Sequence, residues 1–174
     1  MEPELIPFLD PAGQLTSGFE GRVGVYAIYD QAQALQYVGY SRDVGLSLKQ
    51  HLVRQPQGCY WLRVETIERP NRTQLEEIRD AWLADWTAKT DTPPPGNAEQ
   101  SPLWNQPIDA KTQMTEAEQS AYEASDELGK IKTLKQAARR VEAEVLAALE
   151  TRGVKIPIRF DPKAKETGLL DVKS

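Results

Sequence analysis

Cysteine is almost absent from this chain of 174 residues, with Cys59 as the only one. A single thiol cannot form a disulfide within the chain and provides no zinc-ligand spacing, so a structural metal site built on thiolates is excluded. The same scarcity fits a reducing intracellular setting. Long hydrophobic runs are also missing, and the segment Met1–Pro7 lacks the basic and apolar regions of a signal peptide. The sequence therefore predicts a soluble, cytoplasmic protein without a membrane partner.

An excess of positive charge is missing too. The chain has 21 Lys and Arg against 26 Asp and Glu, for a net charge of −5, which is not typical of a protein that binds polyanions over its whole surface. Residues 1–100 hold nine bases and fourteen acids, whereas residues 101–174 hold twelve of each. Apolar residues make up 40% of the chain, and four Trp and six Tyr are among its aromatics, so a buried core can form.

The apolar patterns predict an α+β fold at the N-terminal end. Residues 22–30 and 34–40 are rich in β-branched and aromatic residues and are separated by a polar turn, which indicates an antiparallel hairpin. Residues 59–68 favour a third strand. A helix is predicted to begin at Ser41 as its N-cap. We expect a three-stranded antiparallel sheet flanked by helices, in the order β-β-α-β-α.

The second helix is predicted to begin at Asn71 or Thr73 and to end before Pro93–Gly96, because prolines cannot continue a helix. We place a domain boundary just after this run. The chain then consists of a domain at 1–100 and a mainly helical C-terminal extension at 101–174.

The extension is predicted to be helical over residues 116–150, with a break or bend at Gly129 and a short extended arm at 154–160. Its basic clusters could bind nucleic acid, but glutamates alternate with them, which favours a solvated helix that contacts the domain, a protein partner or a second copy in a homodimer. We expect it to dock through one apolar stripe: Leu128, Ile131, Val141, Val145 and Leu149.

Two tripeptides along the predicted hairpin are more specific. Gly24-Val25-Tyr26 is followed after ten residues by Tyr37-Val38-Gly39. Further matching features come later in the chain: Arg42, His51 and Asn97. Over about residues 22–97 this series resembles the GIY-YIG nuclease family. Within that family the chain looks like the cyanobacterial and plastid branch, which in plants forms the N-terminal part of a chloroplast monothiol glutaredoxin.

The family hydrolyses phosphodiesters with a divalent metal ion. A tyrosine and the metal activate water, an arginine stabilises the phosphorane charge, and a glutamate on a helix holds the metal. The resemblance implies catalytic roles for Tyr26, Tyr37, Arg42 and His51 and substrate binding by Asn97. It also implies Mg²⁺ or Mn²⁺ as the cofactor if the protein is active.

Two positions depart from the family. At the position of the family's arginine this chain has Ser47, and a serine cannot supply a cation that binds phosphate through two hydrogen bonds. The family's glutamate falls on Arg79, which repels a metal ion. Glu76 lies three residues earlier on the same helix face and is the metal ligand that a shifted register would offer. Such a shift restores the carboxylate but not the missing cation.

The same residues also have ordinary structural interpretations. Tyrosines on paired strands are more often packing residues, and a histidine on a helix is more often a surface or hydrogen-bonded residue than a base. Arg42 either contacts phosphate or pairs with an acidic neighbour. Cys59 is either an inert buried thiol or, if exposed, a redox-sensitive one.

Two functional hypotheses remain. In the first, the chain has a GIY-YIG fold that has lost catalysis and acts as an interaction module or a nucleic-acid-associated module. In the second, it is a divalent-metal-dependent DNA endonuclease with a rearranged site. Ser47, Arg79 and the acidity of residues 1–100 favour the first hypothesis.

Overall fold

The computed structural model describes residues 4–173. The chain divides into two compact units, Met1–Asn105 and Gln106–Ser174. The first unit includes a short helix, α3 (Ser101–Asn105), that lies within the extension as delimited from the sequence. None of the helices in the described part of the chain combines the length and apolar character needed to cross a bilayer.

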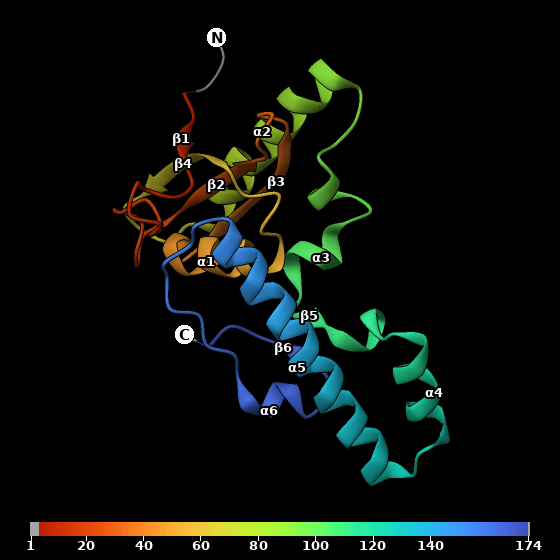
Figure 1. Ribbon diagram of the computed structural model, residues 1–174. Helices are drawn as coiled ribbons and strands as arrows, with labels where there is room; N and C mark the ends of the chain where they lie inside the picture. The colour runs from red at the N-terminus through yellow and green to blue at the C-terminus, as the bar shows by residue number, and fades with distance from the viewer. Residues whose placement is uncertain (1–3, 174) are drawn as a thin grey trace. The chain divides into compact units, whose positions relative to one another are not determined.

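The first unit is built on a four-stranded antiparallel sheet with the strand order β1-β4-β2-β3 (Figure 1). Its strands are β1 (Ile6–Pro7), β2 (Val23–Tyr29), β3 (Leu35–Ser41) and β4 (Trp61–Ile67). The α+β fold class and the three longer antiparallel strands are confirmed. The short β1, which pairs with β4, is additional, because two residues are too few to show an alternating pattern.

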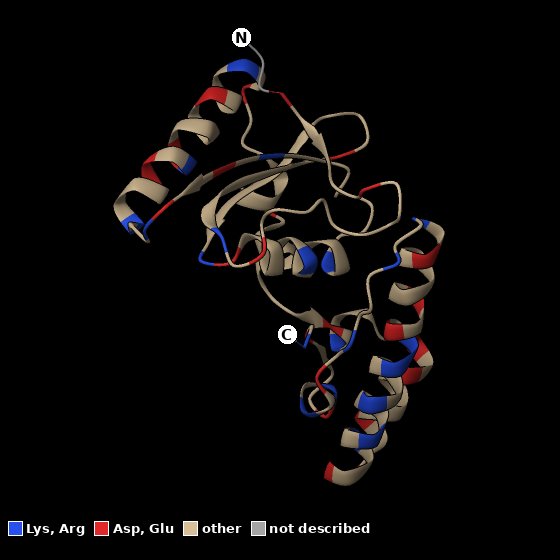
Figure 2. Ribbon diagram, turned by 90° about the vertical axis from the view of Figure 1, so that its left-hand side faces the viewer, with Lys and Arg blue, Asp and Glu red and all other residues tan. Residues whose placement is uncertain are grey.

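Two helices cover opposite faces of this sheet, α1 (Val44–Arg54) and α2 (Arg72–Thr90) (Figures 1 and 2). Successive side chains of a strand point to opposite faces. On β2, Ala27 and Tyr29 therefore join the apolar cluster that includes Trp82 of α2. Tyr26 points to the other face, where its ring lies against His51 of α1.

The helix N-termini show how local hydrogen bonds set the boundaries. Asn71 caps α2 as expected, and its side chain accepts a hydrogen bond from the backbone N–H of Gln74. The prediction of Ser41 as the cap of α1 is wrong. Asp43 is the cap, with its carboxylate accepting from the N–H of Leu46, while Ser41 ends β3 and its hydroxyl bonds the backbone of Asp43.

The segment after α2 runs along the edge strand β3 through a short 3-10 helix, η1 (Pro95–Asn97), and then α3. Trp104 of α3 is the bulkiest of the fully buried side chains in the described chain. The turn at Gly96 packs against it so closely that an added Cβ would stand 2.9 Å from the indole and 2.6 Å from the Gln36 carbonyl oxygen. Only glycine fits there.

The second unit contains a long helix with shorter elements around it. These are β5 (Ile108–Asp109), η2 (Ala110–Gln113), α4 (Glu116–Ala124), α5 (Glu127–Thr151), α6 (Pro162–Lys165) and β6 (Leu169–Leu170). Antiparallel β5 and β6 form a separate two-stranded sheet. Residues of both charge signs alternate along α5 (Figure 2).

The helical character predicted for residues 116–150 is confirmed, but the break does not fall at Gly129. It falls at Ser125 and Asp126, because the Asp126 carboxylate caps α5 by accepting from the Gly129 N–H at 2.8 Å. The docking stripe is wrong at its start, where Leu128 is 78% exposed and Ile131 42% exposed. The packed face of α5 begins further along the helix and includes these buried residues: Thr133, Ala137, Ala138, Val141 and Leu149.

Candidate functional site

Three of the predicted site residues meet on the α1 face of the sheet. The hydroxyl of Tyr26 lies 2.7 Å from Nε2 of His51. The ring of Tyr37 lies 6.1 Å from that of Tyr26 and 4.7 Å from that of His51, measured between centroids. Gly39 leaves space for this group, because a Cβ there would stand 2.9 Å from the Tyr26 hydroxyl. The two tripeptides therefore contribute to one packed group: they supply the two tyrosines, and the glycine of the second leaves room for them.

Trp104 closes this group. Its indole stacks on the ring of Tyr37 with an interplanar angle of 1° and a centroid distance of 5.5 Å. Tyr26 and His51 are each only 3% exposed, and Trp104 and Tyr37 are buried as well. The Tyr37 hydroxyl donates to the side-chain oxygen of Asn105 at 2.6 Å. The Tyr26 phenol is therefore shielded from solvent and already bonded to a protein group.

Burial keeps these groups neutral. Desolvation raises the pKa of Tyr26 well above its usual value, and the neighbouring Tyr37 raises it further. Desolvation also raises the pKa of Tyr37, against the opposing effects of the Arg79 and Arg54 guanidinium groups. At neutral pH both phenols therefore keep their protons.

His51 is the group whose protonation differs most from that of a free side chain. Desolvation lowers its pKa to about 3, with a further lowering by Arg54, whereas the Trp104 carbonyl opposes the fall. That carbonyl accepts from Nη1 of Arg54 at 3.0 Å. Among the described residues, Nδ1 of His51 makes no hydrogen bond of standard geometry, so the Trp104 carbonyl acts on the imidazole without a well-formed bond. The structure thus holds a neutral imidazole at physiological pH. Of the two ordinary interpretations, a surface residue or a hydrogen-bonded one, His51 matches the second.

Ser47 lies beside the Tyr26 hydroxyl, where it opposes the rise of the Tyr26 pKa. Its own hydroxyl bonds that of Ser41 at 2.7 Å. Ser47, the position at which the resemblance expects an arginine, is therefore next to the tyrosine. A hydroxyl at this position provides no positive charge.

Two carboxylates of α2, Glu76 and Asp80, are paired with arginines. Arg79 lies over the ring of Tyr40, at 5.2 Å from its centroid, and bonds Asp80 at 3.0 Å. Glu76 accepts from Nε of Arg72 at 2.9 Å and from the hydroxyl of Tyr40 at 3.1 Å. These two hydrogen bonds lower the pKa of Glu76, with that from Arg72 contributing most.

A divalent metal ion does not fit this donor set. Glu76 and Asp80 each have an arginine beside them, and a hard cation needs several free oxygen ligands. Within residues 4–173 no three His, Cys, Asp or Glu side chains gather where they could hold one metal ion. We therefore assign no metal-dependent step to Glu76.

The other predicted residues, Arg42 and Asn97, have different surroundings. Arg42 is exposed and lines a cavity of about 420 Å³ that also includes Asn71 and Arg72.

Asn97 pairs with the backbone of Val38 on the edge strand β3. Its side-chain oxygen accepts from the Val38 N–H, and its amide donates to the Val38 carbonyl, both at 2.8 Å. Cys59 is buried, as an inert thiol would be.

An open cavity of about 460 Å³ lies beside the closed group, along β3 and α2. Its polar lining includes Tyr37, Arg79, Asp80, Asn97 and Asn105. Arg79 is the cation of this lining, and its electrostatic effect reaches the Tyr37 phenol.

Sequence reasoning missed Trp104 and Asn105, since both follow the expected domain boundary and nothing near residue 104 signals contact with the hairpin. Arg54 had a usable signal, because it lies one turn after His51 on the same helix.

No family model matches the sequence. The chain is similar to the bifunctional monothiol glutaredoxin-S16, chloroplastic, of Arabidopsis thaliana, with 32% identity over 96 residues. The match covers 55% of this chain and 31% of that protein. The chain therefore spans about a third of the length of this relative, and what is shown is similarity to one part of a chloroplast monothiol glutaredoxin.

Proposed function

We propose that this chain is a catalytically degenerate protein of the GIY-YIG nuclease fold that associates with nucleic acid instead of cleaving it. The observation that carries the proposal is the buried hydrogen bond between Tyr26 and His51 beneath Trp104. A group that activates water must reach that water and exchange protons at working pH. These two side chains are neutral, bonded to each other and covered.

The charges around the cavity support the same proposal. Hydrolysis of a phosphodiester needs cations that stabilise the developing charge on the phosphoryl oxygens. Ser47 provides none beside Tyr26, and Arg79 takes the place at which the resemblance implies a metal-binding glutamate. Nε of Arg79 bonds Asp80 in the same open polar cavity, and the other N–H groups of its guanidinium suit a bound phosphate group instead.

Association and hydrolysis are tested separately. For hydrolysis, supercoiled plasmid is incubated with the protein and either Mg²⁺ or Mn²⁺, with Tyr26→Phe as the matched variant. We expect equal nicking by both proteins, because losing one charge stabiliser already costs about 100-fold to 1000-fold in rate. Ser47→Arg alone should not restore activity, since Arg79 would still repel the metal ion. Metal-dependent nicking that disappears in Tyr26→Phe would establish the endonuclease alternative.

For association, fluorescence polarisation of labelled single- and double-stranded oligonucleotides measures binding over a salt series. We expect Arg79→Gln to weaken binding several-fold and to reduce the salt slope by about one, as for the loss of one phosphate contact. Arg72→Gln is the matched control on the same helix, because Arg72 does not line this cavity. If the unchanged protein shows no binding at low salt, the nucleic-acid part of the proposal fails, and a protein partner becomes the alternative.

A further inference from the structure

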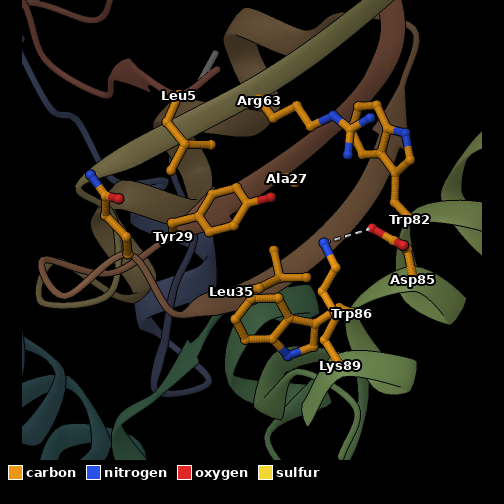
Figure 3. Close-up of a pocket in the computed structure, with 10 residues that line it drawn as sticks. Leu5, Ala27, Tyr29, Leu35, Arg63, Trp82, Asp85, Trp86 and Lys89 are labelled. Carbon is orange, nitrogen blue, oxygen red and sulfur yellow. Dashed lines mark ion pairs between the residues drawn. The ribbon is translucent and has the colours of Figure 1, made fainter. Parts of the chain in front are cut away.

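A separate pocket lies on the α2 face of the sheet, away from Tyr26 (Figure 3). It has a volume of about 240 Å³. Side chains from the segment before β1, from all three longer strands and from α2 contribute to it. Its lining includes Tyr29, Leu35, Arg63, Trp86 and Lys89.

The inner part of the pocket is aromatic and apolar. Tyr29 and Trp86 meet edge to face, with their ring centroids 6.5 Å apart and an angle of 78° between the planes. Leu35 lies beside Trp86, and Ala27 is the small residue of the lining on β2 (Figure 3). Rings of this kind favour another ring in stacked or edge-on contact.

The outer part carries an excess of positive charge. The guanidinium of Arg63 lies 3.9 Å from the ring centroid of Trp82, and Lys89 pairs with Asp85 at 3.4 Å. Within residues 4–173 no carboxylate forms an ion pair with Arg63, so the pocket has two cations against one anion. The net positive charge of the pocket contrasts with the net negative charge of residues 1–100.

Trp82 holds Arg63 in place before any ligand arrives. A guanidinium that lies on an indole is attracted to the ring face and keeps its N–H groups available at its edge. Those N–H groups are matched to the two oxygens of a carboxylate. Arg63 is therefore an anchor that loses little conformational freedom on binding.

We propose that this pocket binds a small aromatic monocarboxylate. The ring would lie among Tyr29, Leu35 and Trp86, and the carboxylate would face Arg63 and Lys89. The volume suits a single ring, since pockets for larger ligands span roughly 300–1000 Å³. A single excess positive charge suits a monoanion better than a phosphate dianion. The proposal is independent of nucleic-acid association, because it concerns the other face of the sheet.

The test uses the full chain labelled with ¹⁵N and benzoate as the probe. The indole N–H resonances of Trp82 and Trp86 report binding at the pocket, and single Trp→Phe variants identify them. We expect saturable shifts with a Kd of about 1 mM, the range open to a ligand of this size. Benzamide has the same shape without the charge and should bind at least about tenfold more weakly. Cyclohexanecarboxylate, which lacks the aromatic ring, should also bind more weakly.

Arg63→Gln should weaken benzoate binding about tenfold and remove the preference over benzamide. Arg72→Gln, which changes an exposed arginine outside the pocket, should leave both unchanged. If Arg63→Gln does not fold, Lys89→Gln replaces it, with an expected loss of a few-fold. Absence of saturable shifts at about 20 mM benzoate, or equal binding of benzoate and benzamide, overturns the proposal. An equal loss in Arg72→Gln also overturns it.

Discussion

The two faces of the first unit's sheet use similar residues in opposite ways. On the α1 face, Tyr26 and His51 lie under Trp104, neutral and without access to solvent. On the α2 face, Tyr29 and Trp86 line a pocket that opens beside charged side chains. Successive side chains of β2 point to opposite faces of the sheet, and Tyr26 and Tyr29 therefore lie in these different environments. What decides between packing and a binding site is whether a large neighbour covers the aromatic group.

A single small residue decides on each face whether the aromatic group is covered. Trp104 reaches the α1 face because the turn at Gly96 has no side chain to hold α3 away. On the α2 face, Ala27 leaves a gap where a larger residue would pack against Trp82 and Trp86. Substitutions on each face test whether Trp104 closes the first face and whether Arg63 serves packing or binding on the second.

Trp104→Ala should have the largest effect. Removing a fully buried indole should lower the free energy of unfolding by about 3–5 kcal/mol, through lost burial and a cavity above Tyr37. Urea denaturation measures the change. Leu103→Ala is the matched control, because Leu103 is the exposed neighbour on α3 and should cost less than about 0.5 kcal/mol.

Uncovering this face should also rehydrate His51. The pKa of the imidazole in Trp104→Ala should rise from about 3 toward its ordinary value of about 6.5, as followed by NMR of the ring protons. An unchanged pKa would mean that Trp104 does not close the site.

Acidification should destabilise the protein through His51. The folded-state pKa is lowered, so between pH 6.5 and 3 the unfolded chain binds the proton more tightly, and stability falls as pH falls. Between pH 7 and 5 this contributes a loss of about 2 kcal/mol. Other groups titrate as well, so the contribution of His51 is the difference in pH dependence between the unchanged protein and His51→Gln. Identical pH dependence in the two would contradict a buried neutral imidazole.

The sequence predicted the hairpin and both major helices, because these depend on local patterns. The grouping of Tyr26, Tyr37 and His51 came from the family resemblance, which also included Arg42, and the structure places Arg42 in a different cavity. The sequence could not predict that the site is closed. That depends on Trp104, which is 53 residues from His51 along the chain and makes its contact only in the folded state. The pocket beside Trp86 was missed for a similar reason, since the segment before β1, three strands and α2 all contribute to it.

Asn97→Ala should have a smaller effect, on the edge of the sheet. The side chain makes both hydrogen bonds of the Val38 backbone, and their loss should cost about 1.5 kcal/mol. Hydrogen exchange gives the specific measurement, because the Val38 amide should lose protection while that of Ala27, inside the sheet, keeps it. If the Val38 amide stays protected, Asn97 is not a structural clamp, and its role in binding a substrate regains support.

Arg63→Gln should have the smallest effect on stability and gives the sharpest comparison of the two faces. Its guanidinium loses one contact with the Trp82 ring, which is worth about 0.5–1 kcal/mol at a partly exposed site. Urea denaturation in the absence of any ligand measures this cost. A cost near that of Trp104→Ala would make Arg63 a structural residue and both faces equivalent. A small cost combined with a loss of benzoate binding would separate them, with one face built for packing and the other available to a ligand.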